Sequence, residues 1–262
     1  MDVGCNTGSI GIELVKHNCT VDGIEYSKKY YDILKKSGVY ENIYNISVSD
    51  FNSKGFKNFY DNKVKYDYII FADVLEHLVN PQEVIYMLSS KLKPKGKIII
   101  SVPNIAHIDI IINLLNGKFN YSNEGLLDDT HLRFFTKSSF IQMITNIENS
   151  KNNNYNVDLF AQTKVVPGYL DNKEVKMIQD NTMFNDEIFV IQNLFELTKS
   201  KTKQKRNYGN QDYFDEIVKN YYKLLDTIKS LTDQNIVLGN AYSNVINSKW
   251  WKLKKKILFW KK

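Results

Sequence analysis

The chain has 262 residues, of which 43% are hydrophobic and 13% aromatic, so it can bury the core of one large α/β domain or two small ones. This composition excludes a disordered chain, and no run approaches the roughly 20 apolar residues that a membrane span needs. The net charge of +6 resides in the tail, because residues 249–262 hold seven lysines and no acidic residue.

The main body of the chain is therefore almost neutral, which gives no support for a nucleic-acid partner. The N-terminus lacks a basic segment that leads into an apolar one, so we expect a cytoplasmic protein. Cys5 and Cys19 are too few for a disulfide framework and have no paired metal-ligand spacing, so both are expected to be free thiols.

Apolar segments alternate with helical ones along the first two hundred residues. A glycine loop at residues 1–8 precedes a helical pattern around residues 10–15, and a strand at 20–25 precedes a helix between Ser27 and Gly38. Further strands are expected at 45–50, 66–73 and 95–104, with a helix from Pro81, and closing strands at 155–166 and 186–197. Such alternation predicts an α/β fold with a doubly wound, mainly parallel sheet.

A domain boundary is expected after residue 198. Residues 199–211 are charged and contain helix breakers, which indicates a linker. Residues 212–248 carry apolar side chains in two rows of period seven, with Asn235 in one of them. This pattern predicts a long helix that forms a homodimeric coiled coil or folds back on the preceding domain. Residues 249–262 form a basic, aromatic tail.

Three strand ends carry the residues that point to a ligand. Gly4 and Gly8 flank the first turn, where bare backbone lets a cofactor approach a helix N-terminus. Glu25 ends the second strand and can accept both ribose hydroxyls of an adenosine. Asp50 ends the expected third strand, placed for an adenine amino group, and Phe51 can stack on the ring.

The order of these motifs resembles class I S-adenosylmethionine-dependent methyltransferases. The resemblance covers residues 1–197 and rests on DVGCNTG, VDGIEYS, SVSD, FADVLEHL and LKPKGKIIISVPN. The spacing GxxxG, in place of GxGxxG, argues against the nicotinamide-dependent oxidoreductases. The stretch from Pro103 to Thr136 is similar to a subgroup associated with glycosyltransferases of bacterial surface-polysaccharide biosynthesis.

This resemblance implies S-adenosyl-L-methionine as cofactor and a seven-stranded Rossmann-like sheet. It also implies that the cofactor is bound by residues on several strand ends, namely Asp2, Gly4, Cys5, Asn6, Gly8, Glu25, Asp50, Phe51, Asp73 and Leu75. Only three residues precede Gly4, so the first strand is expected to be truncated, which places stability and cofactor binding in question.

Histidines are the candidates for catalysis. His77, His107 and His131 can each remove a proton from a sugar hydroxyl, and Asp128 and Asp129 can orient His131. No metal is the leading expectation. The alternative is a divalent cation at Asp73, Glu76 and His77, which share one face if the chain turns helically there.

Arg133 is one of two arginines among 35 basic residues, which suggests that its planar fork of donors is used. It can bind a phosphate of a nucleotide- or lipid-linked sugar, with Asp128 and Asp129 nearby, or form a buried ion pair with one of them.

The function expected is O-methylation of a sugar of a cell-surface glycan or of its activated precursor. The rivals are a truncated, non-catalytic scaffold for a glycosyltransferase and a nicotinamide-dependent oxidoreductase. Lysine and tryptophan in the tail suit an anionic membrane surface, so peripheral association with the inner face of the plasma membrane is expected.

Overall fold

A computed structural model describes residues 1–151, 154–181 and 185–200 of the chain. The predicted heptad helix and basic tail lie outside these residues, as does the predicted linker except for Lys199 and Ser200, which belong to the last strand. Residues 1–165 and 187–200 belong to one compact unit, and residues 166–181 belong to a second.

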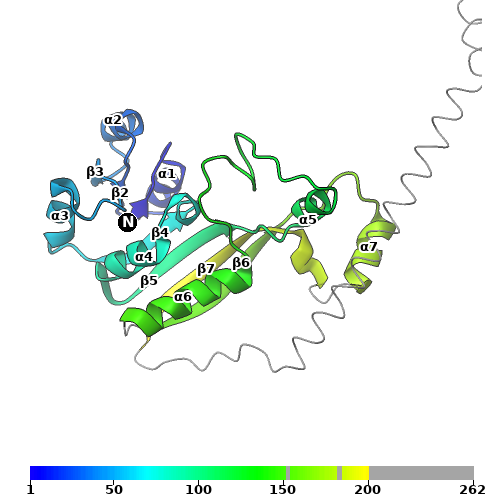
Figure 1. Cartoon of the computed structure of the whole chain (residues 1–262). Coiled ribbons are helices and arrows are strands. Elements are labelled where there is room, and N and C mark those ends of the chain that lie inside the picture. The colour runs from blue at the N-terminus through cyan, green and yellow to red at the C-terminus, as the bar shows by residue number, and fades with distance from the viewer. Residues whose placement is uncertain (152–153, 182–184, 201–262) are drawn as a thin grey trace, which may run out of the picture. The chain divides into compact units, whose positions relative to one another are not determined.

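The first unit is built on a seven-stranded sheet, as the resemblance implied, and its strand order is β3-β2-β1-β4-β5-β7-β6 (Figure 1). Its strands are β1 Asp2–Val3, β2 Asp22–Ile24, β3 Asn42–Tyr44, β4 Tyr66–Ala72, β5 Leu92–Pro103, β6 Asn154–Lys164 and β7 Val190–Ser200. The first five strands are mutually parallel, whereas β7 is antiparallel to both β5 and β6.

The helices of this unit are α1 Ser9–Lys16, α2 Lys28–Ser37, α3 Lys54–Asp61, α4 Pro81–Ser89, α5 Ile108–Leu115 and α6 Lys137–Lys151, with 3-10 turns η1 Leu75–His77 and η2 Asn185–Phe189. Helices α4 and α6 lie over the same face of the sheet, where they contact each other (Figure 1). The main core lies beneath them and includes Ile69, Ile98, Phe140 and Phe195, all fully buried.

The first strand has two residues, and it pairs on both sides. Asp2 and Val3 are in register with β2 and with β4. The terminal ammonium of Met1 donates to the carbonyl of Tyr68 at 2.8 Å, and the carbonyl of Met1 accepts from the Ile70 N–H. The backbone groups of β4 that face this end of β1 are therefore paired.

The expectation for the third strand is wrong. The strand is Asn42–Tyr44, and residues 45–50 belong to no strand, with a turn at residues 48–49. The Asp22 carboxylate fixes this register, because it accepts from both the main-chain and side-chain nitrogens of Asn42 at 3.0 Å. The amide of Asn45 then donates to the carbonyls of Glu25 and Tyr26, which ends the pairing.

The second unit contains α7 Asn172–Asn181. A reciprocal pair of hydrogen bonds begins this helix: the Asp171 N–H donates to the Glu174 carboxylate, and the Glu174 N–H donates to Asp171. This is the capping-box arrangement of a helix N-terminus. Among the described residues, no helix has the length and apolar character that crossing a membrane requires.

Candidate active site

The loop between β1 and α1 is shaped by two glycines with left-handed backbone. Gly4 has φ +74° and Gly8 has φ +85°. A Cβ on Gly4 would lie 2.7 Å from a methyl carbon of Val74, and one on Gly8 would lie 2.6 Å from Leu34. The loop therefore packs against Val74, which follows β4, and against Leu34 of α2, and neither glycine position has room for a side chain.

Glu25 ties this loop to the end of β2. Its two carboxylate oxygens accept from the Asn6 N–H at 2.8 Å and the Ser27 N–H at 2.7 Å. Each oxygen can accept one more hydrogen bond, because an ionised carboxylate offers about four lone-pair positions. The structure thus brings Asn6, Gly8 and Glu25 to one edge of the sheet, where the first two strands end.

Asp2 and Cys5 support the loop from behind. Asp2 is buried and accepts from the Tyr40 hydroxyl at 2.7 Å, and burial raises the pKa of its carboxyl. The Cys5 thiol donates to the Ile24 carbonyl, and burial raises its pKa to about 12. Its side chain packs toward Gly23, so the contact of Cys5 with the cofactor remains a prediction, and its backbone would make that contact.

Asp50 and Phe51 lie beyond the end of β3 instead of at it. Asp50 is exposed in a turn, where its N–H donates to the Ser47 carbonyl. Phe51 is half-buried and packs edge-on against Phe56, with ring centroids 5.2 Å apart. Contact of these two residues with adenine remains a prediction, and it would be made from the loop that follows β3.

Asp73 follows β4 and is held by the neighbouring strands. One of its carboxylate oxygens accepts from the Ser101 hydroxyl at 2.9 Å and from the Gln192 amide at 2.6 Å. Its backbone is left-handed, with φ +54°, so Asp73 does not lie on the same face of a helical turn as Glu76 and His77. Leu75 has no exposed surface and belongs to the main core, so its side chain does not line a cofactor surface.

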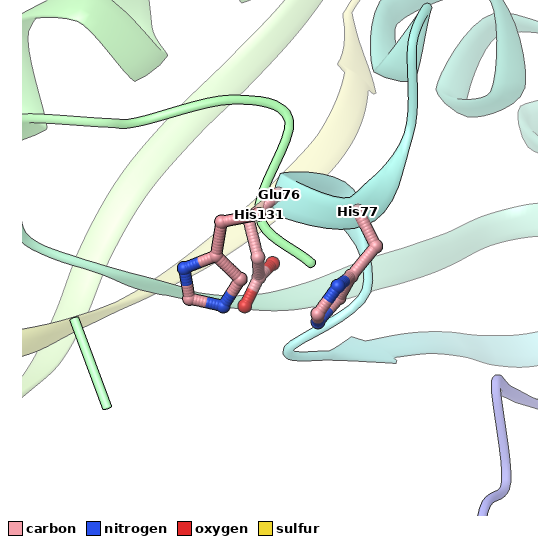
Figure 2. Close-up of side chains that lie close together, drawn as sticks. All are labelled: Glu76, His77 and His131. Carbon is pink, nitrogen blue, oxygen red and sulfur yellow. The ribbon is translucent and has the colours of Figure 1, made fainter. Parts of the chain in front are cut away.

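Glu76, His77 and His131 come together at the same edge of the sheet. One ligand-type atom from each of the three side chains lies within 4.8 Å of the others. In Figure 2 the Glu76 carboxylate is seen between the two imidazole rings, whose centroids are 4.8 Å apart. The Glu76 carbonyl accepts from the main-chain N–H groups of Leu132 and Arg133, which holds the loop of His131 against η1.

The Asp128 carboxylate reaches His77 through Thr130, whereas His131 is hydrogen-bonded to the main-chain carbonyl of Asp128. Its carboxylate accepts from the Thr130 hydroxyl at 2.6 Å and from the Thr130 N–H at 2.8 Å, and these bonds lower the pKa of Asp128. The Thr130 hydroxyl and carbonyl lie 3.1 and 3.2 Å from Nδ1 of His77. Asp129 is exposed, and its N–H donates to Ser122.

Arg133 is exposed, so it does not form the buried ion pair considered above. Its guanidinium donates from Nε at 3.2 Å and from Nη2 at 2.5 Å to the main-chain carbonyl of Val79. These contacts use two of its five donors and leave the rest of the fork for an anionic ligand.

His107 has a structural role, so the expectation that it is a catalytic base is wrong. It is fully buried at the N-cap of α5. Its Nδ1 accepts from the Asp109 N–H, and its Nε2 lies 2.8 Å from the Val165 carbonyl. Both ring nitrogens are therefore engaged within the fold.

Sequence reasoning missed several residues that shape this edge. Tyr40, Thr130 and Gln192 each hold a candidate site residue by a hydrogen bond. A signal existed for Thr130, because the run Asp128–Asp129–Thr130 has the pattern of a carboxylate that bonds its own backbone two residues on.

The class of the protein follows from the sheet and from one comparison. The antiparallel β7 between β5 and β6 differs from the dinucleotide-binding order, in which six strands run 3-2-1-4-5-6. The profile of the family described as "Methyltransferase domain" matches residues 1–147, more than half of the chain. The chain belongs to this family, among the class I S-adenosylmethionine-dependent methyltransferases.

Curated relatives are named for O-methylation. The chain is 28% identical over 132 residues to the "Ubiquinone biosynthesis O-methyltransferase" of Coxiella burnetii strain RSA 493, which covers 47% of this chain and 55% of the relative. The protein of the same name from Rickettsia bellii is 27% identical over 150 residues, covering 56% of this chain and 60% of the relative. The chain thus spans little more than half the length of these relatives.

Solved structures of methyltransferases are similar at lower identity. A SAM-dependent methyltransferase from Archaeoglobus fulgidus has a TM-score of 0.48 at 18% identity, covering 76% of this chain and 84% of that one. The magnesium protoporphyrin IX methyltransferase from Synechocystis PCC 6803, solved with S-adenosylhomocysteine, has a TM-score of 0.47 at 14% identity, covering 76% and 73%.

Proposed function

We propose that this protein is an S-adenosyl-L-methionine-dependent methyltransferase that acts on a hydroxyl oxygen. The observation that carries the proposal is the Glu25 carboxylate, which joins the glycine loop to the end of β2 through Asn6 and Ser27. The family match supports methyl transfer, and the O-methyltransferase relatives support oxygen as the acceptor.

The residues at this edge fit an adenosyl cofactor. The glycine loop leads into the N-terminus of α1 with Asn6 and Thr7 exposed, and Glu25 keeps an acceptor position on each oxygen for a ribose diol. Asp73 is fixed by Ser101 and Gln192 and exposes its carboxylate at the end of β4. We propose that these groups bind the ribose and the methionine part, with Asp50 and Phe51 at the adenine.

The bound cofactor supplies an activated methyl group, which is transferred by in-line displacement at carbon. The protein therefore has to align the acceptor oxygen and provide a path for its proton. His77 and His131 are the candidates, because each uses Nδ1 within the fold and has Nε2 available. Burial lowers the pKa of His131, which favours the neutral ring that a base requires.

The acceptor we propose is a sugar of a cell-surface glycan or its nucleotide- or lipid-linked precursor. Three aromatic rings lie together beside His131: Phe119, Tyr121 and Phe134 have centroids between 5.6 and 6.4 Å apart, and Phe134 is 6.3 Å from the His131 ring. Phe119 and Tyr121 are exposed and offer an apolar platform for a ring. The free donors of Arg133 suit a phosphate.

Calorimetric titration with S-adenosylhomocysteine tests the cofactor. We expect the full chain to bind, and Glu25→Ala to weaken binding by at least about tenfold, because two charge-assisted contacts to the ribose are lost. Glu13→Ala removes an exposed carboxylate of α1 and serves as the matched control. Equal affinity of Glu25→Ala and the parent chain would refute the assignment of the ribose site.

The rival functions predict other results. A non-catalytic scaffold for a glycosyltransferase would bind no S-adenosylhomocysteine, and a nicotinamide-dependent oxidoreductase would be stabilised by NAD and not by the methyl donor. If the cofactor binds, mass spectrometry of candidate acceptors then separates sugars from other hydroxyl compounds by the gain of one methyl group.

A further inference from the structure

The starting observation is a buried carboxylate oxygen without a partner. Glu76 is 1% exposed, and its Oε2 makes no hydrogen bond with any residue that the structure describes. Burial raises the pKa of Glu76 to about 8, and the nearby carboxylates of Asp73 and Asp128 act in the same direction. Unsatisfied buried polar atoms cost about 1 to 3 kcal/mol and are rare in native folds, so this one requires an explanation.

The two neighbouring histidines have defined tautomers. A carbonyl can only accept, so the Leu126 carbonyl, 3.3 Å from Nδ1 of His131, requires a proton on that nitrogen. The Thr130 carbonyl, 3.2 Å from Nδ1 of His77, requires the same. In both neutral rings the lone pair is therefore on Nε2, and the hydrogen bond at Nδ1 orients the ring, as is usual for histidines that ligate metals.

We propose that Glu76, His77 and His131 bind a divalent transition-metal ion, of which Zn²⁺ is the model case. Two imidazole nitrogens and one carboxylate oxygen form a three-ligand set that leaves one coordination position open. The ligand atoms lie within 4.8 Å of one another, whereas a tetrahedral site brings them to about 3.3 Å. Binding thus draws the ligand atoms together by up to about 1.5 Å and gives Oε2 its missing partner.

This set differs from the one that the sequence suggested. His131 takes the place of Asp73, whose carboxylate is engaged by Ser101 and Gln192. The hydrogen bonds from Leu132 and Arg133 to the Glu76 carbonyl hold the two parts of the site together. The hydrogen bonds that connect Asp128 through Thr130 to His77 place a negative charge behind one ligand and orient its ring.

The role of the ion rests on the proposed function. The open position takes the acceptor hydroxyl, whose pKa falls on coordination, so its proton leaves to solvent water. The oxygen then forms a bond to the methyl carbon while the bond from that carbon to sulfur breaks, and the electron pair remains on sulfur as a neutral thioether. His77 and His131 act in this scheme as ligands and not as bases.

Metal binding is measured on the full chain with the metal alone. After treatment with a chelator, Zn²⁺ calorimetry and the visible absorption of added Co²⁺ should report about one ion per chain in a four-coordinate site. His131→Ala, His77→Ala and Glu76→Gln should each weaken Zn²⁺ binding by at least about tenfold and lose the Co²⁺ bands. His17→Ala, at an exposed position on α1's C-cap, should change neither.

Two results would overturn the inference: no stoichiometric ion in the parent chain, or affinity that is unchanged in the three ligand variants. Cys19→Ser serves as the background, because this exposed thiol could bind zinc by itself. Calorimetry with S-adenosylhomocysteine, run on the same variants, verifies that they fold. If the chain binds the ion but not S-adenosylhomocysteine, the proposed function is refuted and the metal site stands. If it binds S-adenosylhomocysteine but not the ion, the metal site is refuted and the proposed function stands.

Discussion

Gly11 shows how close packing, and not backbone freedom, can require glycine in a helix. It lies within α1, and a Cβ at this position would lie 2.4 Å from the Tyr40 hydroxyl, which donates to buried Asp2. Alanine gains up to about 1 kcal/mol of helix propensity, but overpacking costs about 1 to 3 kcal/mol. We therefore expect Gly11→Ala to lower the free energy of unfolding, measured by urea denaturation.

Gly168→Ala is the matched control, because nothing lies within 4 Å of its Cβ position. It should leave stability within about 0.5 kcal/mol of the parent chain. If Gly11→Ala were as stable as this control, the close contact between α1 and Tyr40 would be incorrect.

The candidate site could be predicted from sequence where its residues are local. Glu25 and the glycine loop are recognisable because each directly follows a strand of clear pattern. The approach of His131 to Glu76 was not predictable, because it depends on two main-chain hydrogen bonds across more than fifty residues. His107 looked equally suitable as a base until its position at the N-cap of α5 was known.

At the scale of elements, Lys91 caps the C-terminus of α3, a helix that lies about thirty residues earlier in the chain. Its buried ammonium donates to the main-chain carbonyls of Phe59, Tyr60 and Asn62, at the end of α3. The last carbonyls of a helix have no partner within it, so this side chain satisfies them. Burial lowers the pKa of Lys91, yet its partners are all oxygens that require a donor.

Lys91→Met should therefore destabilise the protein by about 2 to 4 kcal/mol, because the apolar side chain leaves these carbonyls buried and unpaired. Lys57→Met replaces an exposed lysine of the same helix and should change stability by less than about 0.5 kcal/mol. Thermal unfolding followed by circular dichroism compares the two. A small effect of Lys91→Met would mean that water replaces the ammonium at these carbonyls.

Strands β2, β4 and β5 were predicted to within a few residues, and β3 was not. β4 and β5 are long and buried, so their pattern is sufficient. β3 has three residues, and its position depends on the contact of Asp22 with Asn42, which no local pattern reveals. Helix α6 was not predicted, although its start carries a sequence signal. Thr136 and Ser139 are three residues apart, and each N–H donates to the other's hydroxyl.

At the scale of the whole molecule, one edge of the sheet concentrates the groups that can perform chemistry. The loops that follow β1, β2 and β4 contain Asn6, Glu25, Asp73 and Glu76, and the parallel pairing of these strands brings their ends together. The loop with His131 reaches the same edge through Glu76. This agrees with the general rule that parallel α/β sheets bind ligands at the carboxyl ends of their strands.

The basic tail also concerns the whole molecule, because we expect it to hold the chain at a membrane surface. Residues 249–262 combine seven lysines with Trp250, Trp251 and Trp260. Each lysine near an anionic surface contributes about 1 kcal/mol before screening, and tryptophan prefers the membrane interface. We therefore predict that the full chain co-sediments with vesicles rich in phosphatidylglycerol but not with phosphatidylcholine vesicles, and that raising the salt concentration weakens binding.

Deletion of residues 249–262 should abolish this binding and leave the affinity for S-adenosylhomocysteine unchanged, because the proposed cofactor site lies wholly within the first unit. Replacing only the three tryptophans by alanine separates the contribution of lysine charge from that of tryptophan insertion. If this variant binds vesicles at low salt but not at roughly 0.15 M salt, charge attracts the tail to the membrane and the aromatic side chains retain it there. Undiminished binding after the deletion would assign membrane association to another part of the chain.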